Sequence, residues 1–91
     1  MFQMWVKLNR KGHAVRQMTI EDDREVNRTK KVFDALAKAC KEMDLSQPIW
    51  LEKNVKEFQQ RHKTRFTADN FVEALEYDNL EIQILEEDDF Y

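Results

Sequence analysis

The chain has 91 residues, of which 42% are hydrophobic and 36% are charged, and its formal net charge is -3. This length and composition exclude a second hydrophobic core and disorder throughout, and no apolar run reaches the roughly 18 residues that a membrane-spanning helix needs. Residues 1–65 hold all 15 basic side chains and nine acids, whereas residues 66–91 hold nine acids and no lysine or arginine. A net charge of +6 is therefore followed by one of -9, which is a hint about partners rather than about chemistry.

The first ten residues alternate between apolar and polar side chains, which is the pattern of a strand with one buried face. The side chains on the expected inner face are Phe2, Met4, Val6 and Leu8. Gly12, the only glycine, lies in the polar run that follows and predicts a hairpin turn. A return strand is expected over 14–20, where Arg16 shares the inward phase of Met18 and Ile20. Arg16 must therefore lie near an edge or extend its charged end to solvent.

Two helices are expected in the middle of the chain. Asp22 and Glu25 have the spacing of a capping box and predict the start of the first helix. Apolar residues then recur every three or four positions over about five turns. These residues are Val26, Phe33, Leu36, Ala37, Cys40 and Met43. Ser46 and Pro48 end this helix, because the residue before a proline favours extended backbone. A second amphipathic helix is predicted over about 52–62, and its inward stripe is expected to hold Leu51, Val55, Phe58 and His62.

The last third predicts a short third helix and a final strand. Thr67 has the features of an N-cap, because Phe66 and Phe71 occupy the positions of a hydrophobic staple. An alternating strand follows at Leu80, Ile82 and Ile84. We therefore predict an α+β fold in which the N-terminal β-hairpin and the C-terminal strand form a three-stranded sheet, covered on one face by two helices and a short third helix. One domain spans residues 1–91, with an acidic C-terminal tail at 86–91.

Three short strings in the second half are distinctive, namely Pro48-Ile49-Trp50-Leu51, Lys63-Thr64-Arg65-Phe66-Thr67 and Leu80-Glu81-Ile82. On these strings the chain resembles a group of small uncharacterised bacterial proteins, and the likeness runs over most of its length. The strings hold packing and capping residues rather than a site, so the resemblance implies a bacterial origin and a single domain but no activity.

The first residues and the cysteine content indicate the compartment. The opening residues lack the basic start and long apolar stretch of a secretory signal. Cys40 is the only cysteine, so the chain can form no internal disulfide. We expect a cytoplasmic location with no membrane partner.

No arrangement of residues predicts catalysis, a cofactor or a metal. Cys40 is the only candidate thiol nucleophile, and His13 and His62 are the only imidazoles that could activate it. Cys40 falls on the apolar stripe of the first helix, where a cysteine usually packs as a small hydrophobe. Metal-ligand spacings are missing, and one glycine cannot build a phosphate loop. We therefore expect a protein that is not an enzyme and that needs no cofactor.

A basic segment in the second half supports an alternative function connected with nucleic acid. Its basic residues are Lys53, Lys56, Arg61, Lys63 and Arg65, with Trp50 and Phe66 on either side. Glu52 and Glu57 dilute this patch, and the acidic last third argues against a duplex as partner. The same acids could instead imitate nucleic acid and occupy the basic groove of an enzyme, provided that they form one continuous surface.

The outer face of the sheet is the leading candidate for an interface. Alternation places Trp5 opposite the inner side chains, on a face that also receives Val15, Thr19 and Leu85. A soluble monomer would normally cover such a patch. The cover is either a second copy of the chain or the C-terminal Phe90 and Tyr91. The leading hypothesis is thus a small protein-interaction or accessory domain, which forms a homodimer through this face or a free strand edge.

Overall fold

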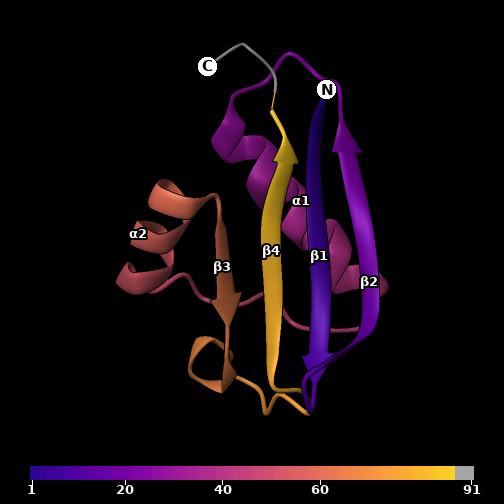
Figure 1. Cartoon of the computed structure of the whole chain (residues 1–91), viewed down its shortest axis with the longest axis vertical. Helices are drawn as coiled ribbons and strands as arrows, with labels where there is room; N and C mark the ends of the chain where they lie inside the picture. The colour runs from indigo at the N-terminus through magenta and orange to yellow at the C-terminus, as the bar shows by residue number, and fades with distance from the viewer. Residues whose placement is uncertain (88–91) are drawn as a thin grey trace.

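A four-stranded antiparallel sheet forms the centre of the fold in the computed structural model, which describes residues 1–87. The strand order is β2-β1-β4-β3. The elements in chain order are β1 (Phe2–Arg10), β2 (His13–Asp22), α1 (Arg28–Glu42), α2 (Glu52–Arg61), β3 (Lys63–Phe66), a 3₁₀ turn η1 (Ala68–Asn70) and β4 (Asn79–Glu86). Figure 1 shows α1 behind the sheet and α2 beside β3. The α+β class is therefore as predicted.

The predicted hairpin of β1 and β2 is confirmed. Lys11 and Gly12 form its turn, with φ of 52° and 78°, and positive φ at both central residues is the geometry of a type I′ turn. The four inward side chains of β1 are at most 1% exposed. Arg16 lies at the edge as predicted, and its Nη2 donates to the carbonyl oxygen of Glu42 at 3.0 Å.

The prediction of a three-stranded sheet is wrong, because the sheet has four strands. Residues 63–66 form β3, which pairs antiparallel with β4 through Thr64 opposite Ile82 and Phe66 opposite Leu80. β4 thus lies in the middle of the sheet, between β1 and β3. β3 was missed because only two of its four side chains face inward. Its partner strand begins 13 residues after it ends, so no local pattern reveals the pairing.

The first helix starts later than predicted, and its buried stripe agrees with the prediction only in part. Leu36, Cys40 and Met43 are buried as predicted. Asn27 is its N-cap and accepts from the backbone N–H of Lys30 at 2.8 Å, whereas Asp22 ends β2. The small residues Ala35 and Ala39 are buried against the sheet. Phe33 was expected in the core but is 48% exposed, because these alanines face the sheet and turn Phe33 to the side.

The second helix is confirmed, but the predicted third helix is only the single 3₁₀ turn η1. Thr67 is the N-cap of this turn, as predicted. Asn70 contributes to the cap, because its Oδ1 accepts from the backbone N–H of Thr67 at 2.9 Å. Val55 of α2, which the apolar stripe placed in the core, is 41% exposed.

Two buried asparagines join α2, β3 and η1. Asn54 donates through Nδ2 to Thr64 Oγ1 and to the carbonyl oxygen of Arg65, both at 2.9 Å. Its Oδ1 accepts from Leu51 N at 3.1 Å and from Asn70 Nδ2 at 2.7 Å. All four hydrogen-bonding positions of the Asn54 amide are therefore filled. Since one bond reaches the backbone of β3, this network also covers the outer edge of that strand.

Neither α1 nor α2, the two α-helices of the described chain, has the length and apolar character that crossing a membrane requires.

Candidate interaction surface on the sheet

The face of the sheet that points away from the core has no helix over it in the described part of the chain. It is turned toward the viewer in Figure 1, where α1 lies behind the strands. Paired residues on neighbouring strands share a face, so the register identifies the side chains on it. They are Gln3, Trp5, Lys7 and Asn9 on β1, Ala14, Gln17, Thr19 and Glu21 on β2, Asn79, Glu81, Gln83 and Glu86 on β4, and Lys63 and Arg65 on β3. We call this set the outer face.

Trp5 lies on one of the two inner strands of the sheet, in register with Thr19 on one side and Gln83 on the other. Its Nε1 donates to Gln17 Oε1 at 3.0 Å. The Lys7 ammonium lies 4.4 Å from the centre of the indole ring, within the range of a cation–π contact. These two contacts hold the ring in one orientation while it stays partly exposed. Trp5 is thus a prepositioned aromatic group on an open surface.

A nearly buried carboxylate lies beside this tryptophan. Glu81 is 6% exposed although it is on the outer face. Its oxygens lie 3.3 Å from Lys7 Nζ, 3.7 Å from Arg65 Nε and 3.4 Å from Asn9 Nδ2. Two cations surround one carboxylate, so the cluster keeps an excess positive charge. Arg65 remains 65% exposed and can still contact a partner.

The four residues predicted for the interface are not all neighbours. Trp5 and Thr19 are directly opposite each other in the β1–β2 register. Val15 and Leu85 instead lie where the register shifts, at opposite ends of β1, and they are 47% and 46% exposed. Polar amides separate these apolar groups. The outer face is therefore a mixed surface around Trp5 rather than a continuous apolar patch.

The predicted basic segment is divided between two surfaces. Lys53, Lys56 and Arg61 are exposed on α2, where Lys56 pairs with Glu52 at 3.2 Å. Lys63 and Arg65 belong to β3 and lie on the outer face with Trp5. The sequence could not show this division, because it depends on the unpredicted strand.

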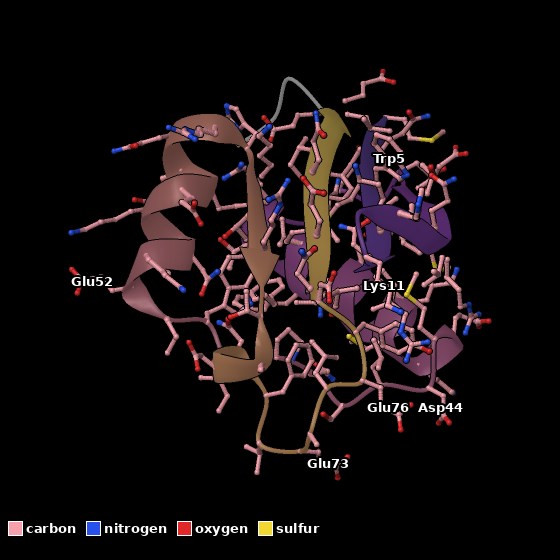
Figure 2. The ribbon with its side chains drawn as sticks, turned by 60° about the horizontal axis from the view of Figure 1, so that its bottom comes forward. Trp5, Lys11, Asp44, Glu52, Glu73 and Glu76 are labelled. Carbon is pink, nitrogen blue, oxygen red and sulfur yellow. The ribbon has the colours of Figure 1, made fainter. Side chains whose placement is uncertain are left out.

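The acidic residues of the last third do not form one surface among residues 66–87. Asp69, Glu73, Glu76 and Asp78 lie on η1 or the loop before β4, and Figure 2 shows Glu73, Glu76 and Asp44 at this end of the molecule. Glu86 lies at the other end of β4, roughly 23 Å away at the usual rise of a strand. Glu86 pairs with the N-terminal ammonium at 3.3 Å, and Glu87 pairs with Arg28.

Part of the predicted acidic tail lies within the fold. Glu86 ends β4, and Glu87 is held by its ion pair. The prediction that Phe90 and Tyr91 cover the outer face concerns residues outside those the structure describes.

The candidate nucleophile is in the core. Cys40 is 1% exposed, and burial raises the pKa of its thiol to about 11. His13 and His62 are both exposed, and His62 Nδ1 lies 3.1 Å from Arg28 Nη2. In the described residues, histidine, cysteine and carboxylate side chains form no group of three or more that could hold a metal ion. The environment of Cys40 is that of a packing residue.

No family model, curated protein or solved structure matches this chain. The bacterial origin implied by the resemblance therefore stays a prediction, and the function must be argued from the surfaces themselves.

Proposed function

We propose that this protein is a non-enzymatic interaction domain that associates with a second copy of itself through the outer face. The observation that carries the proposal is Trp5, which is fixed in orientation by Gln17 and Lys7 on a sheet face that no described element covers. Tryptophan is enriched at the energetic centres of protein interfaces. A rigid tryptophan loses little conformational entropy on binding, which favours association. The cytoplasm remains our proposed location, because Cys40 is a free thiol.

The outer face has amides that can complement an identical face. A two-fold axis parallel to the strands, between β1 and β4, would bring β1 of each copy over β4 of the other. The row that holds Trp5 would then meet the row that holds Gln83, and the row of Lys7 would meet the row of Glu81. Amide donors and acceptors would meet across this interface, which favours self-association. The clusters of Lys7, Glu81 and Arg65 in the two copies would face each other with a net positive charge, which limits the strength of the dimer.

The area of the outer face sets the expected strength of the dimer. Strands of nine and ten residues, at about 3.3 Å per residue and about 4.8 Å between strands, give a face of about 500 Å². Two such faces bury about 1,000 Å², which is at the lower limit for a specific interface. We therefore expect a weak dimer that forms at high protein concentration.

Sedimentation velocity over a wide concentration range tests this function. The Trp5→Lys variant should remain folded and monomeric at concentrations where the native chain sediments as a dimer. Val72→Lys is the matched control, because it adds the same charge at a side chain that is 86% exposed and lies outside the sheet. A native chain that is monomeric at millimolar concentration would contradict the proposal, as would equal effects of both substitutions.

Single-stranded nucleic acid is the second candidate, and one observation favours it. Lys63 and Arg65 share the outer face with Trp5, so cationic groups that suit phosphates lie on the same surface as an aromatic ring on which a base can stack. A titration with a ten-nucleotide oligothymidine at about 50 and 200 mM salt tests it. Salt-dependent quenching of the tryptophan fluorescence by the oligonucleotide, which Trp5→Phe abolishes, would favour this candidate over self-association. The acidic imitation of nucleic acid is disfavoured, because the described acids of the last third are divided between the two ends of β4 and Glu81 within the strand.

A further inference from the structure

A second open site, separate from the outer face, lies between the two helices. A cavity of about 190 Å³ opens between α1 and α2, with Val32 and Phe33 on one side and Val55 and Phe58 on the other. Phe33 and Val55 are 48% and 41% exposed, although each belongs to the apolar stripe predicted for its helix. We call this site the helix groove.

Aromatic rings give the groove a rigid wall and a size that suits one further ring. Trp50 lines it and makes edge-to-face contacts, at 5.8, 5.5 and 5.0 Å between ring centroids, with Phe33, Phe58 and Phe66. Such contacts prefer defined ring orientations, so the wall is rigid. An apolar cavity of about 150 Å³ is large enough to hold one benzene molecule. The groove therefore has room for a single aromatic side chain.

The groove offers no unpaired charge to an occupant. Among the described residues that line it, Arg28 is the only charged one, and its guanidinium already pairs with Glu87. Thr29 and Gln59 are the other polar residues of the lining. Because an ionic group buried against apolar walls without a partner is unfavourable, these walls favour an uncharged apolar side chain.

The described part of the chain ends at the rim of this groove. Glu87 is its last residue, and the Glu87 carboxylate accepts from Arg28 Nε. The same guanidinium lies 5.1 Å from the centre of the Phe58 ring, which lines the groove. Phe90 follows Glu87 by three residues, a reach of about 11 Å in an extended chain. Arg28 and Phe33 are about 7.5 Å apart along the axis of α1, so the groove is within the reach of Phe90.

We propose that the helix groove binds the C-terminal segment of its own chain, residues 88–91, with the ring of Phe90 inserted between Phe33 and Val55. A phenyl ring has no polar atom, so apolar walls leave none of its groups without a partner. The hydroxyl of Tyr91 needs a hydrogen-bond partner when it is buried, so Tyr91 is placed at the mouth of the groove, in contact with water.

The ion pair between Glu87 and Arg28 is what favours this occupant over a separate molecule. A short tether gives the attached group an effective concentration of about millimolar, which an unattached ligand must exceed. A segment in the groove leaves Trp5 uncovered. The proposal is therefore compatible with self-association through the outer face and does not depend on it.

Nuclear Overhauser contacts in NMR spectra of the full chain test the proposal. We expect contacts from the ring protons of Phe90 to the side chains of Phe33 and Val55, and none to Trp5. A sample that mixes isotope-labelled and unlabelled chains shows whether the contacts lie within one chain. Contacts that occur only between chains would overturn the proposal, because the groove would then hold the segment of a second copy.

Variants in the terminal segment identify the anchor. Phe90→Ala should shift the indole N–H signal of Trp50, because it removes a ring from the groove that Trp50 lines. Tyr91→Ala is the matched control and should shift this signal less than one-third as far. Glu87→Gln removes the charge of the tether and should weaken the contacts of Phe90 at least twofold. A thermal melt verifies that each variant is folded.

A small competitor tests whether the native groove is occupied. N-acetyl-phenylalanine amide carries the same ring on a separate molecule, and its binding is followed by the Trp50 signal. It should bind at least fivefold more tightly to Phe90→Ala than to the native chain. Equal affinity for both chains would overturn the proposal, because the groove would then be open to an external apolar side chain. Contacts of Phe90 with Trp5 instead of Phe33, or equal shifts of Trp50 in the Phe90 and Tyr91 variants, would also overturn it.

Discussion

Replacing Asn54 with aspartate should destabilise the protein far more than its small change in shape suggests. The amide nitrogen of Asn54 donates to Thr64 Oγ1 and to the carbonyl oxygen of Arg65, each at 2.9 Å. Asn54→Asp replaces this donor with an acceptor. Thr64 cannot reverse its bond without cost, because its hydroxyl already donates to Glu57 Oε1 at 2.8 Å. The new oxygen therefore faces two acceptors in a site that is 0% exposed.

The cost follows from these contacts. Two net hydrogen bonds are lost at about 1 kcal/mol each, and an unsatisfied buried carbonyl beside a buried carboxylate adds about 1 to 3 kcal/mol. The sum of about 3 to 5 kcal/mol compares with a total stability of about 5 to 10 kcal/mol for a domain of this size. Burial also raises the pKa of the introduced carboxyl above its unfolded value near 4. Its protonated form can donate, so the penalty should be smallest below about pH 4 and should grow as the pH rises.

Urea unfolding of the native chain and Asn54→Asp at several pH values measures this cost. Asn79→Asp is the matched control, because the amide oxygen of Asn79 accepts from Asn9 Nδ2 at 2.7 Å and a carboxylate can still accept. The control should lose well under 1 kcal/mol. Equal losses for the two variants, or a loss at position 54 that does not depend on pH, would refute the assigned hydrogen-bond directions.

Three other predictions test the fold and the chemistry. The hydrogen-bonded Arg24 side chain lowers the pKa of Asp22 to about 2. The Asp22–Arg24 ion pair should therefore stabilise the fold above pH 4 and lose this effect as the pH falls toward 2. Because Arg24 is 47% exposed, we expect the pair to contribute at most about 1 kcal/mol. Urea unfolding between pH 2 and 6 should therefore show Asp22→Asn converging with the native chain at low pH, and a constant difference would contradict this. Cys40 should react with iodoacetamide far more slowly in the native than in the denatured chain, whereas a native rate above that of a free thiol would restore a catalytic role. Phe58→Ala should lower the free energy of unfolding by about 3 to 5 kcal/mol, whereas Phe33→Ala should lower it by only about 1 kcal/mol. Equal losses of stability in thermal melts would show that the burial of these two residues is misassigned.

Sequence patterns predicted the parts of the fold that depend on local alternation. In β1 every second side chain is apolar, and all four inward residues are buried. The same alternation placed Trp5 on the outer face, and the hairpin register brought Thr19 opposite it. These features depend on neighbouring residues and a two-residue turn, so one sequence is enough to infer them.

The remaining features depend on contacts between distant segments. The predicted stripe of α1 included Leu36 and Cys40, which are buried, but it missed Ala35 and Ala39, whose small size permits close packing against the sheet. Phe33 was therefore placed in the core, whereas it lines the cavity between α1 and α2. Lys63 and Arg65 joined the outer face only through the pairing of β3 with β4. The sequence contains these residues, but the pairing that brings them together is not local.

The most direct test of self-association through the outer face is dilution of the native protein, followed by the two tryptophan N–H signals in NMR spectra. Trp5 lies on the proposed interface, and Trp50 lies between the helices and serves as an internal control. We predict that the Trp5 signal and the side-chain amide of Gln17 shift with concentration, with one common midpoint, while the Trp50 signal stays constant. Trp5 signals that do not move between micromolar and millimolar protein would contradict self-association through this face, and so would equal movement of both tryptophans.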